Sequence, residues 1–415
     1  MTTPLTAPMA PATSYPHAGS AAYYRLAIIL GSLAAMGPLA IDMYLPSFPT
    51  IARELHSTPS TVEITAAVYF IGLALGQAVY GPLSDRFGRT RPLYFGLVVF
   101  TLASLGCAFA RSVPQLIVFR ALQALGGCAE MVVARAMVRD YFDQRDSIRI
   151  MSLLMLVMGL APILAPLLGG QLLVHFGWRA VFWTLASYSA LSLAMVWFLL
   201  PESLSHEQRR RDSAGAILGV YGQLLRNRAF LAYAISGSLI ISSMFAYIAG
   251  SPFVFIELYH VPADRYGLFF GTNAIGLIAA SQINGRLARR FTPRAILSRV
   301  LPITAAASLI FLFDAWTGAG GFLGLLLPLF LCVASVGFVL PNTSVLAMAP
   351  HGRIAGSASA LLGTIQFGFG ALAGAMVSTF NNGTARPLGA VVGACGVCAL
   401  LVYQLTPSTP ADPRH

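Results

Sequence analysis

The chain has 415 residues, of which 57% are hydrophobic and only 10% are charged. This composition is far more apolar than that of a soluble domain and places most of the chain in a lipid bilayer. The net charge of +11 is dispersed over short polar intervals, so it favours contact with anionic lipid and argues against nucleic-acid binding.

Residues 1–24 are rich in Pro, Ala, Thr and Ser and carry no charged side chain, so they lack the basic leader of a signal peptide. We expect a disordered cytoplasmic tail there. Twelve apolar stretches follow, each about twenty residues long, which is the length that a helix needs to cross a bilayer. They cover 26–46, 62–80, 92–110, 114–138, 150–174, 180–200, 230–255, 266–284, 295–313, 322–348, 355–380 and 388–405.

The longest polar interval, 201–228, divides these stretches into six and six. The sequence therefore predicts an all-α integral membrane protein with twelve transmembrane helices in two pseudo-symmetric six-helix bundles. The bundles would span 25–200 and 229–406, with a cytoplasmic linker at 201–228 and a C-terminal tail at 407–415. Within the linker, 214–225 is expected to form a short helix at the membrane surface.

Arginine supplies all 26 basic residues and predicts the orientation. If the N-terminus is cytoplasmic, nineteen arginines fall in cytoplasmic segments, five on the opposite side, and Arg120 and Arg135 inside a span. By the positive-inside rule, both termini are expected in the cytoplasm.

A charged run between the second and third spans, Gly81 to Arg91, predicts a tight loop. A degraded copy lies 204 positions later, where Gly285, Arg290 and Phe291 correspond to Gly81, Arg86 and Phe87, and this repeat supports two related halves. Gly81 would let two helices touch, and Asp85 would face the positive end of a helix in the other half. A plain positive-inside anchor is the alternative.

Asp42 and Arg120 are expected at similar depth in the first and fourth spans, and they form a candidate charge pair or shared proton site. A buried arginine is costly in a bilayer, so Arg120 needs a partner unless it snorkels to the outer interface. Asp42 without a role at a helix end is the corresponding alternative. Glu130 is the rival proton carrier, or it pairs with a cytoplasmic arginine.

The fifth span contains two prolines among small residues, a pattern that permits a kink and close helix contact. The residues singled out there are Gly159, Pro162, Pro166, Gly169 and Gly170.

These motifs resemble the major facilitator superfamily. The loop is similar to its signature Gly-x-x-x-Asp-Arg-x-Gly-Arg-Arg, with Thr90 in place of the last Arg, and the match comprises Gly81, Asp85, Arg86, Gly88 and Arg89. In the family, these contacts latch the cytoplasmic side shut. The residues from Arg120 to Ala129 resemble the family's buried Arg-x-x-Gln-Gly-x-Gly pattern, with Ala124 in place of the first Gly.

The fifth span resembles the antiporter signature Gly-x-x-x-Gly-Pro-x-x-Gly-Gly, with Ala161 and Ala165 at the two earlier Gly positions. The stretch around Asp42, together with 138–142 and 178–180, resembles the bicyclomycin and chloramphenicol resistance branch, Bcr/CflA. The resemblance implies proton-coupled export of lipophilic drugs across the bacterial inner membrane by alternating access. A transporter of one metabolite, as exporter or proton symporter, is the alternative.

The expected substrate cavity is apolar with scattered amides and suits lipophilic, neutral or cationic molecules. Its candidate residues are Tyr69, Gln77, Gln123, Met131, Tyr247, Asn273, Asn342, Gln366 and Phe367, although each amide could instead bridge two helices. No lysine is present to build a nucleotide-binding loop, so the proton gradient is the expected energy source, without cofactor or metal. Neither an enzyme's catalytic constellation nor an appended soluble domain is evident, and we expect a monomer.

Overall fold

The computed structural model describes residues 20–205, 207, 209 and 214–406. The predicted tail at 407–415, and the one at 1–24 up to residue 19, lie outside these residues. The first helix begins at Ala21, so 21–24 are helical where a tail was predicted. The Ser20 side chain explains this start, because it accepts a hydrogen bond from the Tyr23 backbone and caps the first turn.

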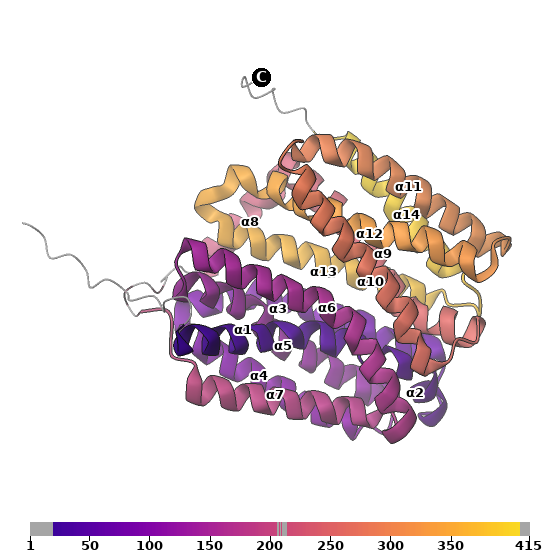
Figure 1. Cartoon of the computed structure of the whole chain (residues 1–415), viewed down its shortest axis with the longest axis horizontal. Helices are drawn as coiled ribbons and strands as arrows, with labels where there is room; N and C mark the ends of the chain where they lie inside the picture. The colour runs from indigo at the N-terminus through magenta and orange to yellow at the C-terminus, as the bar shows by residue number, and fades with distance from the viewer. Residues whose placement is uncertain (1–19, 206, 208, 210–213, 407–415) are drawn as a thin grey trace, which may run out of the picture.

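Twelve long helices are present in the described part of the chain, six in each half, which confirms the predicted fold class (Figure 1). The N-terminal half contains α1 (Ala21–Asp42), α3 (Pro59–Phe87), α4 (Thr90–Ala108), α5 (Val113–Tyr141), α6 (Gln144–Phe176) and α7 (Arg179–Leu199). The C-terminal half contains α9 (Arg228–Pro252), α10 (Ala263–Leu287), α11 (Pro293–Thr317), α12 (Gly321–Met348), α13 (Ala355–Thr379) and α14 (Arg386–Gln404).

Eleven of the twelve helices are long and apolar enough to cross a membrane by length and composition. The exception is α10, whose membrane-length stretch is the most polar of the twelve. Its two buried asparagines bond to neighbouring helices of the same half. Asn273 donates to the Tyr247 hydroxyl of α9 at 3.0 Å, and Asn284 accepts from Asn342 of α12 at 2.7 Å. Such pairing lets a polar helix lie inside a membrane bundle.

Short elements connect the long helices. Leu45–Ser47 and α2 (Phe48–Glu54) follow α1, a π-helical turn (Phe253–Leu258) extends α9, and Ala349–Ile354 joins α12 to α13. The linker forms α8 (Ala214–Arg226), close to the short helix that the sequence predicts. Tyr221 of α8 donates to the Ala78 carbonyl of α3, while Leu224 is buried against α9 and α13, so α8 contacts both halves.

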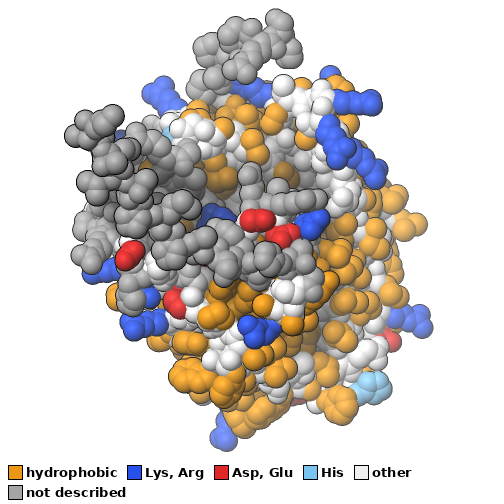
Figure 2. Space-filling model, turned by 60° about the vertical axis from the view of Figure 1, so that its left-hand side comes forward, with side chains coloured by type: hydrophobic (Ala, Val, Ile, Leu, Met, Phe, Trp, Pro, Cys, Tyr) orange, Lys and Arg blue, Asp and Glu red, His pale blue; other side chains and the backbone are white. Residues whose placement is uncertain are grey.

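The helices alternate in direction and define two faces. The side on which α1 begins, α14 ends and the α3–α4 loop and α8 lie is called the terminal face. The opposite side, called the far face, carries α2 and the α13–α14 loop. Figure 2 brings the terminal face forward and shows arginine and acidic side chains gathered on it, with hydrophobic side chains on the flank. This distribution is typical of a protein whose flank contacts lipid.

The two halves meet along two helix pairs, α3 with α13 and α6 with α10. Small residues make these contacts close. A Cβ on Gly374 would lie 3.5 Å from that of Ala67, and a Cβ on Gly267 would lie 2.7 Å from the Leu167 backbone nitrogen. Membrane helices associate through this kind of small-residue packing, so the candidate site between the halves is bordered by four tightly apposed helices.

Candidate functional site

Arg120 of α5 is completely buried, which rules out the snorkelling alternative in this conformation. Its guanidinium lies between the rings of Tyr44 and Tyr69, 4.1 Å from each centroid. It also donates to the Ala40 carbonyl at 3.0 Å and to the Gln123 side chain. Cation–π contacts are strong when the cation is desolvated, so two aromatic faces offset much of the cost of burying this charge.

The Ala40 carbonyl belongs to the last turn of α1, where carbonyl groups lack intrahelical partners and carry partial negative charge. Arg120 therefore caps the C-terminus of α1. Gln123 extends the network by donating to Ser104 at 2.7 Å, and Tyr44 shares a 2.9 Å hydrogen bond with Thr65. Arg120 thus ties α1, α3, α4 and α5 together inside the N-terminal half.

Asp42 does not pair with Arg120, so the predicted ion pair is absent from this conformation. The carboxyl group is buried, and its Oδ1 has no hydrogen-bond partner in the described part of the chain. It lies close enough to Tyr247 and Tyr266 to interact electrostatically with both. Asp42 and Arg120 do not pair because of the rotation of α1 about its axis. The last turn of α1 directs Ala40 toward Arg120 and Asp42 toward the C-terminal half.

Glu130 is also completely buried in α5, and neither of its oxygens has a partner among the described residues. The alternative in which Glu130 pairs with a cytoplasmic arginine is therefore not realised in this conformation. Asp42 at the end of α1 and Glu130 near the middle of α5 are consequently both buried without a counter-ion among the described residues.

The predicted cavity residues have different surroundings. Gln123, Asn273 and Asn342 bond to side chains of other helices within their own half, so these amides bridge helices, while Tyr69 contacts Arg120. Gln77 approaches the opposite half and Met131 lines a hollow. Tyr247 accepts the Asn273 bond near Asp42, Phe367 stacks on Phe245, and Gln366 is partly buried on α13.

Aromatic rings and amides carry the contact between the halves at mid-height. Phe70 of α3 packs on Phe245 of α9 with centroids 4.4 Å apart, and Phe245 stacks on Phe367 of α13 at 5.4 Å. The Gln77 side chain approaches Gly363 so closely that a Cβ there would lie 2.9 Å from its Oε1. Gln366 is partly buried on the same helix.

The glycines of the α6 motif are in close contact, as predicted from the small residues around Pro162 and Pro166, which both lie inside α6. A Cβ on Gly169 would overlap the Met43 carbonyl oxygen, and one on Gly170 would lie 2.7 Å from the Ala263 carbonyl oxygen of α10. A Cβ on Gly159 would lie 3.2 Å from the Ile278 side chain. The motif therefore packs α6 against α1 on one side and against the other half on the other.

The α3–α4 loop forms a charge network on the terminal face. Arg89 pairs with Asp85 at 2.5 Å and with Asp140 of α5 at 2.8 Å. Gly88 has a φ of +92°, a conformation that favours glycine. The side chain of Arg86 lies over Phe87, and Gly81 faces Ala360 of α13 at an ordinary contact distance. The expected contact of Asp85 with a helix end in the other half stays a prediction.

Glu202, just after α7, holds the linker against this loop. Its carboxylate accepts hydrogen bonds from the backbone of Arg89 and Thr90, from the Thr90 hydroxyl and from the backbone of Leu204, at 2.8 to 3.1 Å. Partial burial alone would raise the pKa of Glu202, but these donors outweigh it and lower the pKa below its ordinary value of 4.5. Glu202 therefore caps the N-terminus of α4 as an anion.

On the far face, a hydrogen bond connects the two halves. Asn381, after α13, donates to Oε1 of buried Glu63 in α3 at 3.0 Å. Tyr44, Glu202 and Asn381 were not among the site residues predicted from the sequence. Tyr44 follows Asp42 by two positions, and Glu202 is the first acid after the sixth span. These sequence positions do not indicate that Tyr44 contacts Arg120 or that Glu202 binds the α3–α4 loop.

Comparisons with known proteins agree with this architecture. Residues 30–375 match the family Major Facilitator Superfamily. The chain is 37% identical over 380 residues to an uncharacterized MFS-type transporter, YdgK, of Bacillus subtilis, covering 91% of this chain and 94% of the relative. It is 31% identical to a bicyclomycin resistance protein homolog of Haemophilus influenzae, covering 92% of this chain and 96% of that one.

Among solved structures, the fold is similar to that of the xylose transporter XylE from E. coli in a partially occluded inward open conformation. The TM-score is 0.72 at 15% identity, with 95% of this chain and all of the other covered. This likeness concerns the fold alone. With the family match and the two relatives, it shows a multi-pass membrane transporter rather than an enzyme, and the chain belongs to the major facilitator superfamily.

Proposed function

We propose that this transporter exports lipophilic small molecules, of the chloramphenicol or bicyclomycin kind, in exchange for protons. The relative named as a bicyclomycin resistance protein homolog supports drug export. One structural observation carries the coupling: Asp42 is buried next to the C-terminal half, and its Oδ1 has no partner in the described part of the chain. Protonation and release at such a group change its charge, which two conformations of the surrounding helices would accommodate differently.

In this mechanism, the terminal face is cytoplasmic, because nineteen of the 26 arginines fall on that side in the predicted topology. Substrate enters from the terminal face, the halves rock about the site between them, and a proton taken up at Asp42 from the far face drives the return. Arg120 keeps α1 in place next to Asp42. Glu130 is the second candidate proton carrier.

The test measures drug-dependent proton movement in membrane vesicles that contain wild-type protein, Asp42→Asn or Glu130→Gln. We expect Asp42→Asn to abolish the movement and Glu130→Gln to retain part of it. If Asp42→Asn still moves protons while Glu130→Gln does not, Glu130 is the carrier. A drug-susceptibility panel on expressing cells, repeated with a protonophore, tests export itself, and unchanged resistance to every compound would refute it.

A further inference from the structure

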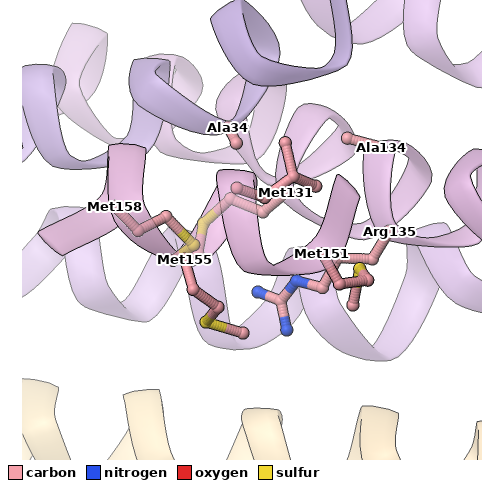
Figure 3. Close-up of a pocket in the computed structure, with 8 residues that line it drawn as sticks. Ala34, Met131, Ala134, Arg135, Met151, Met155 and Met158 are labelled. Carbon is pink, nitrogen blue, oxygen red and sulfur yellow. The ribbon is translucent and has the colours of Figure 1, made fainter. Parts of the chain in front are cut away.

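An open hollow lies between α1, α5 and α6, toward the terminal face (Figure 3), and its empty space of about 320 Å³ includes open solvent. Four methionines and one arginine dominate its lining, which consists of Ala34, Met131, Ala134, Arg135, Met151, Leu154, Met155 and Met158. In Figure 3 the Arg135 guanidinium lies between Met151 and Met155, and ribbons of the C-terminal half run opposite. The hollow is narrow in this conformation, so a ligand larger than water has to displace the flexible methionine side chains.

Arg135 has no ion pair or hydrogen bond to the described residues. Two other arginines of the N-terminal half are neutralised or shielded, since Arg89 in the α3–α4 loop pairs with two acids and Arg120 lies between two tyrosines. The charged group that influences Arg135 is Arg139, one turn along α5, and it repels rather than compensates. The hollow is therefore a locally positive site.

A structural explanation for Arg135 would be snorkelling to the terminal face, as Arg139 does on the exposed side of α5. Arg135 is partly exposed, but its guanidinium lies among thioether side chains, which are only weak acceptors. Because no described residue pairs with it, the Arg135 charge is available to a ligand that supplies a counter-ion.

We propose that this hollow binds lipophilic organic acids, with the carboxylate on Arg135 and the apolar body against the methionines. The planar guanidinium can donate two parallel hydrogen bonds to one carboxylate. Methionine side chains are flexible and polarisable, so they adapt to apolar bodies of different shape. The arginine also disfavours a cationic ligand. This subsite deepens the proposed export function and adds acids to the neutral and cationic molecules expected from the sequence.

The experiment compares a matched pair of probes, 1-naphthylacetate and its methyl ester, which differ in the negative charge. Binding to the full-length protein in lipid nanodiscs is measured by calorimetry at neutral pH, without a proton gradient. We expect the wild-type protein to bind the acid about tenfold more tightly than the ester, as a charge-assisted pair provides. Arg135→Gln should abolish this preference while leaving ester binding unchanged.

Arg139→Gln is the matched control, because it removes the same charge from the same helix outside the hollow. It should leave ester binding unchanged and weaken acid binding much less than Arg135→Gln does, because Arg139 acts on the hollow only through its charge. If Arg135→Gln does not fold, Arg135→Lys serves instead; it keeps the charge without the planar fork and should weaken acid binding alone. Equal affinity of the wild-type protein for acid and ester, no binding of the acid, or equal losses for both probes in the variant would overturn the proposal.

Binding without a gradient separates this proposal from proton-coupled export. If the acid binds through Arg135 but no compound drives proton movement in vesicles, the export function fails and the subsite stands. If drug-driven proton movement occurs while the acid shows no dependence on Arg135, the subsite fails and the export function stands.

Discussion

Gly170 is the position where one added methyl group should shift the balance between conformations. It lies on α6 and faces the first turn of α10 in the other half. A Cβ there would lie 2.7 Å from the Ala263 carbonyl oxygen and 3.1 Å from the Asp264 Cα, both backbone atoms that cannot rotate away. Gly170→Ala therefore clashes only while the far face is closed around this contact.

The magnitude follows from the cost of overpacking, about 1 to 3 kcal/mol for one misplaced methyl group. Because the clash is made between the halves, the penalty applies to the closed far face and disappears when the halves separate there. The equilibrium should shift toward open conformations by the corresponding factor, about 5-fold to 150-fold. We expect slower transport as well, because the cycle requires both conformations.

The assay is a distance measurement by pulsed electron paramagnetic resonance between spin labels at Arg53 and Asn382, two exposed positions on far-face segments of the two halves. Cys398 is replaced by Ser, since it is the exposed one of the five cysteines. Gly170→Ala should increase the population with the longer distance.

Two other glycine substitutions serve as controls for Gly170→Ala. Gly31→Ala adds a methyl group on α1 with no atom within 4 Å and should behave as wild type. Gly169→Ala makes its Cβ overlap the Met43 carbonyl oxygen within the same half, so it should lower thermal stability without a specific shift in the distance between the labels. A distance distribution for Gly170→Ala that matches the wild-type one would refute the claim that this contact closes the far face.

Three further predictions concern other contacts. Glu202→Ala should cost about 1 kcal/mol of stability, because the α4 cap is lost. Folding lowers the pKa of Glu202, so the stabilisation by its carboxylate is present above about pH 4.5 and is lost as the pH falls below that value. A difference in melting temperature between wild type and variant that persists at pH 3 would contradict the role of Glu202 as an anionic cap. Asn381→Ala leaves Glu63 without its partner and should favour the open far face by about 1 kcal/mol, as measured with a label pair away from residue 381; an unchanged distribution would remove this bond from the closure. Arg120→Lys cannot stack between two rings as a planar group and should lower stability by about 1 to 2 kcal/mol, and a melting temperature equal to that of the wild type would contradict the cation–π account.

Several features of the site were predictable because they depend on local sequence. The α3–α4 loop shows this, since Gly88 occurs where the backbone has a positive φ and Asp85 and Arg89 are one helical turn apart and pair directly. The close approach at Gly169 and Gly170 likewise followed from small residues beside two prolines.

The partners of the buried charges were not predictable in the same way. Similar depth in two spans indicated that Asp42 and Arg120 would pair, but depth says nothing about the rotation of a helix about its axis. Arg120 contacts the Ala40 carbonyl and two tyrosines, while Asp42 faces Tyr247 and Tyr266.

By itself, the sequence determined the twelve helices and their division into two halves, because bilayer thickness sets the length of each span and desolvated charge is excluded from most of it. Only the tertiary structure decided which acids stay unpaired, which glycines touch the other half and that Arg135 lines a methionine-rich hollow. Those outcomes depend on helix rotation and on contacts between residues far apart in the chain, such as Asn381 with Glu63. No local pattern encodes that geometry, since it results from packing all twelve helices together.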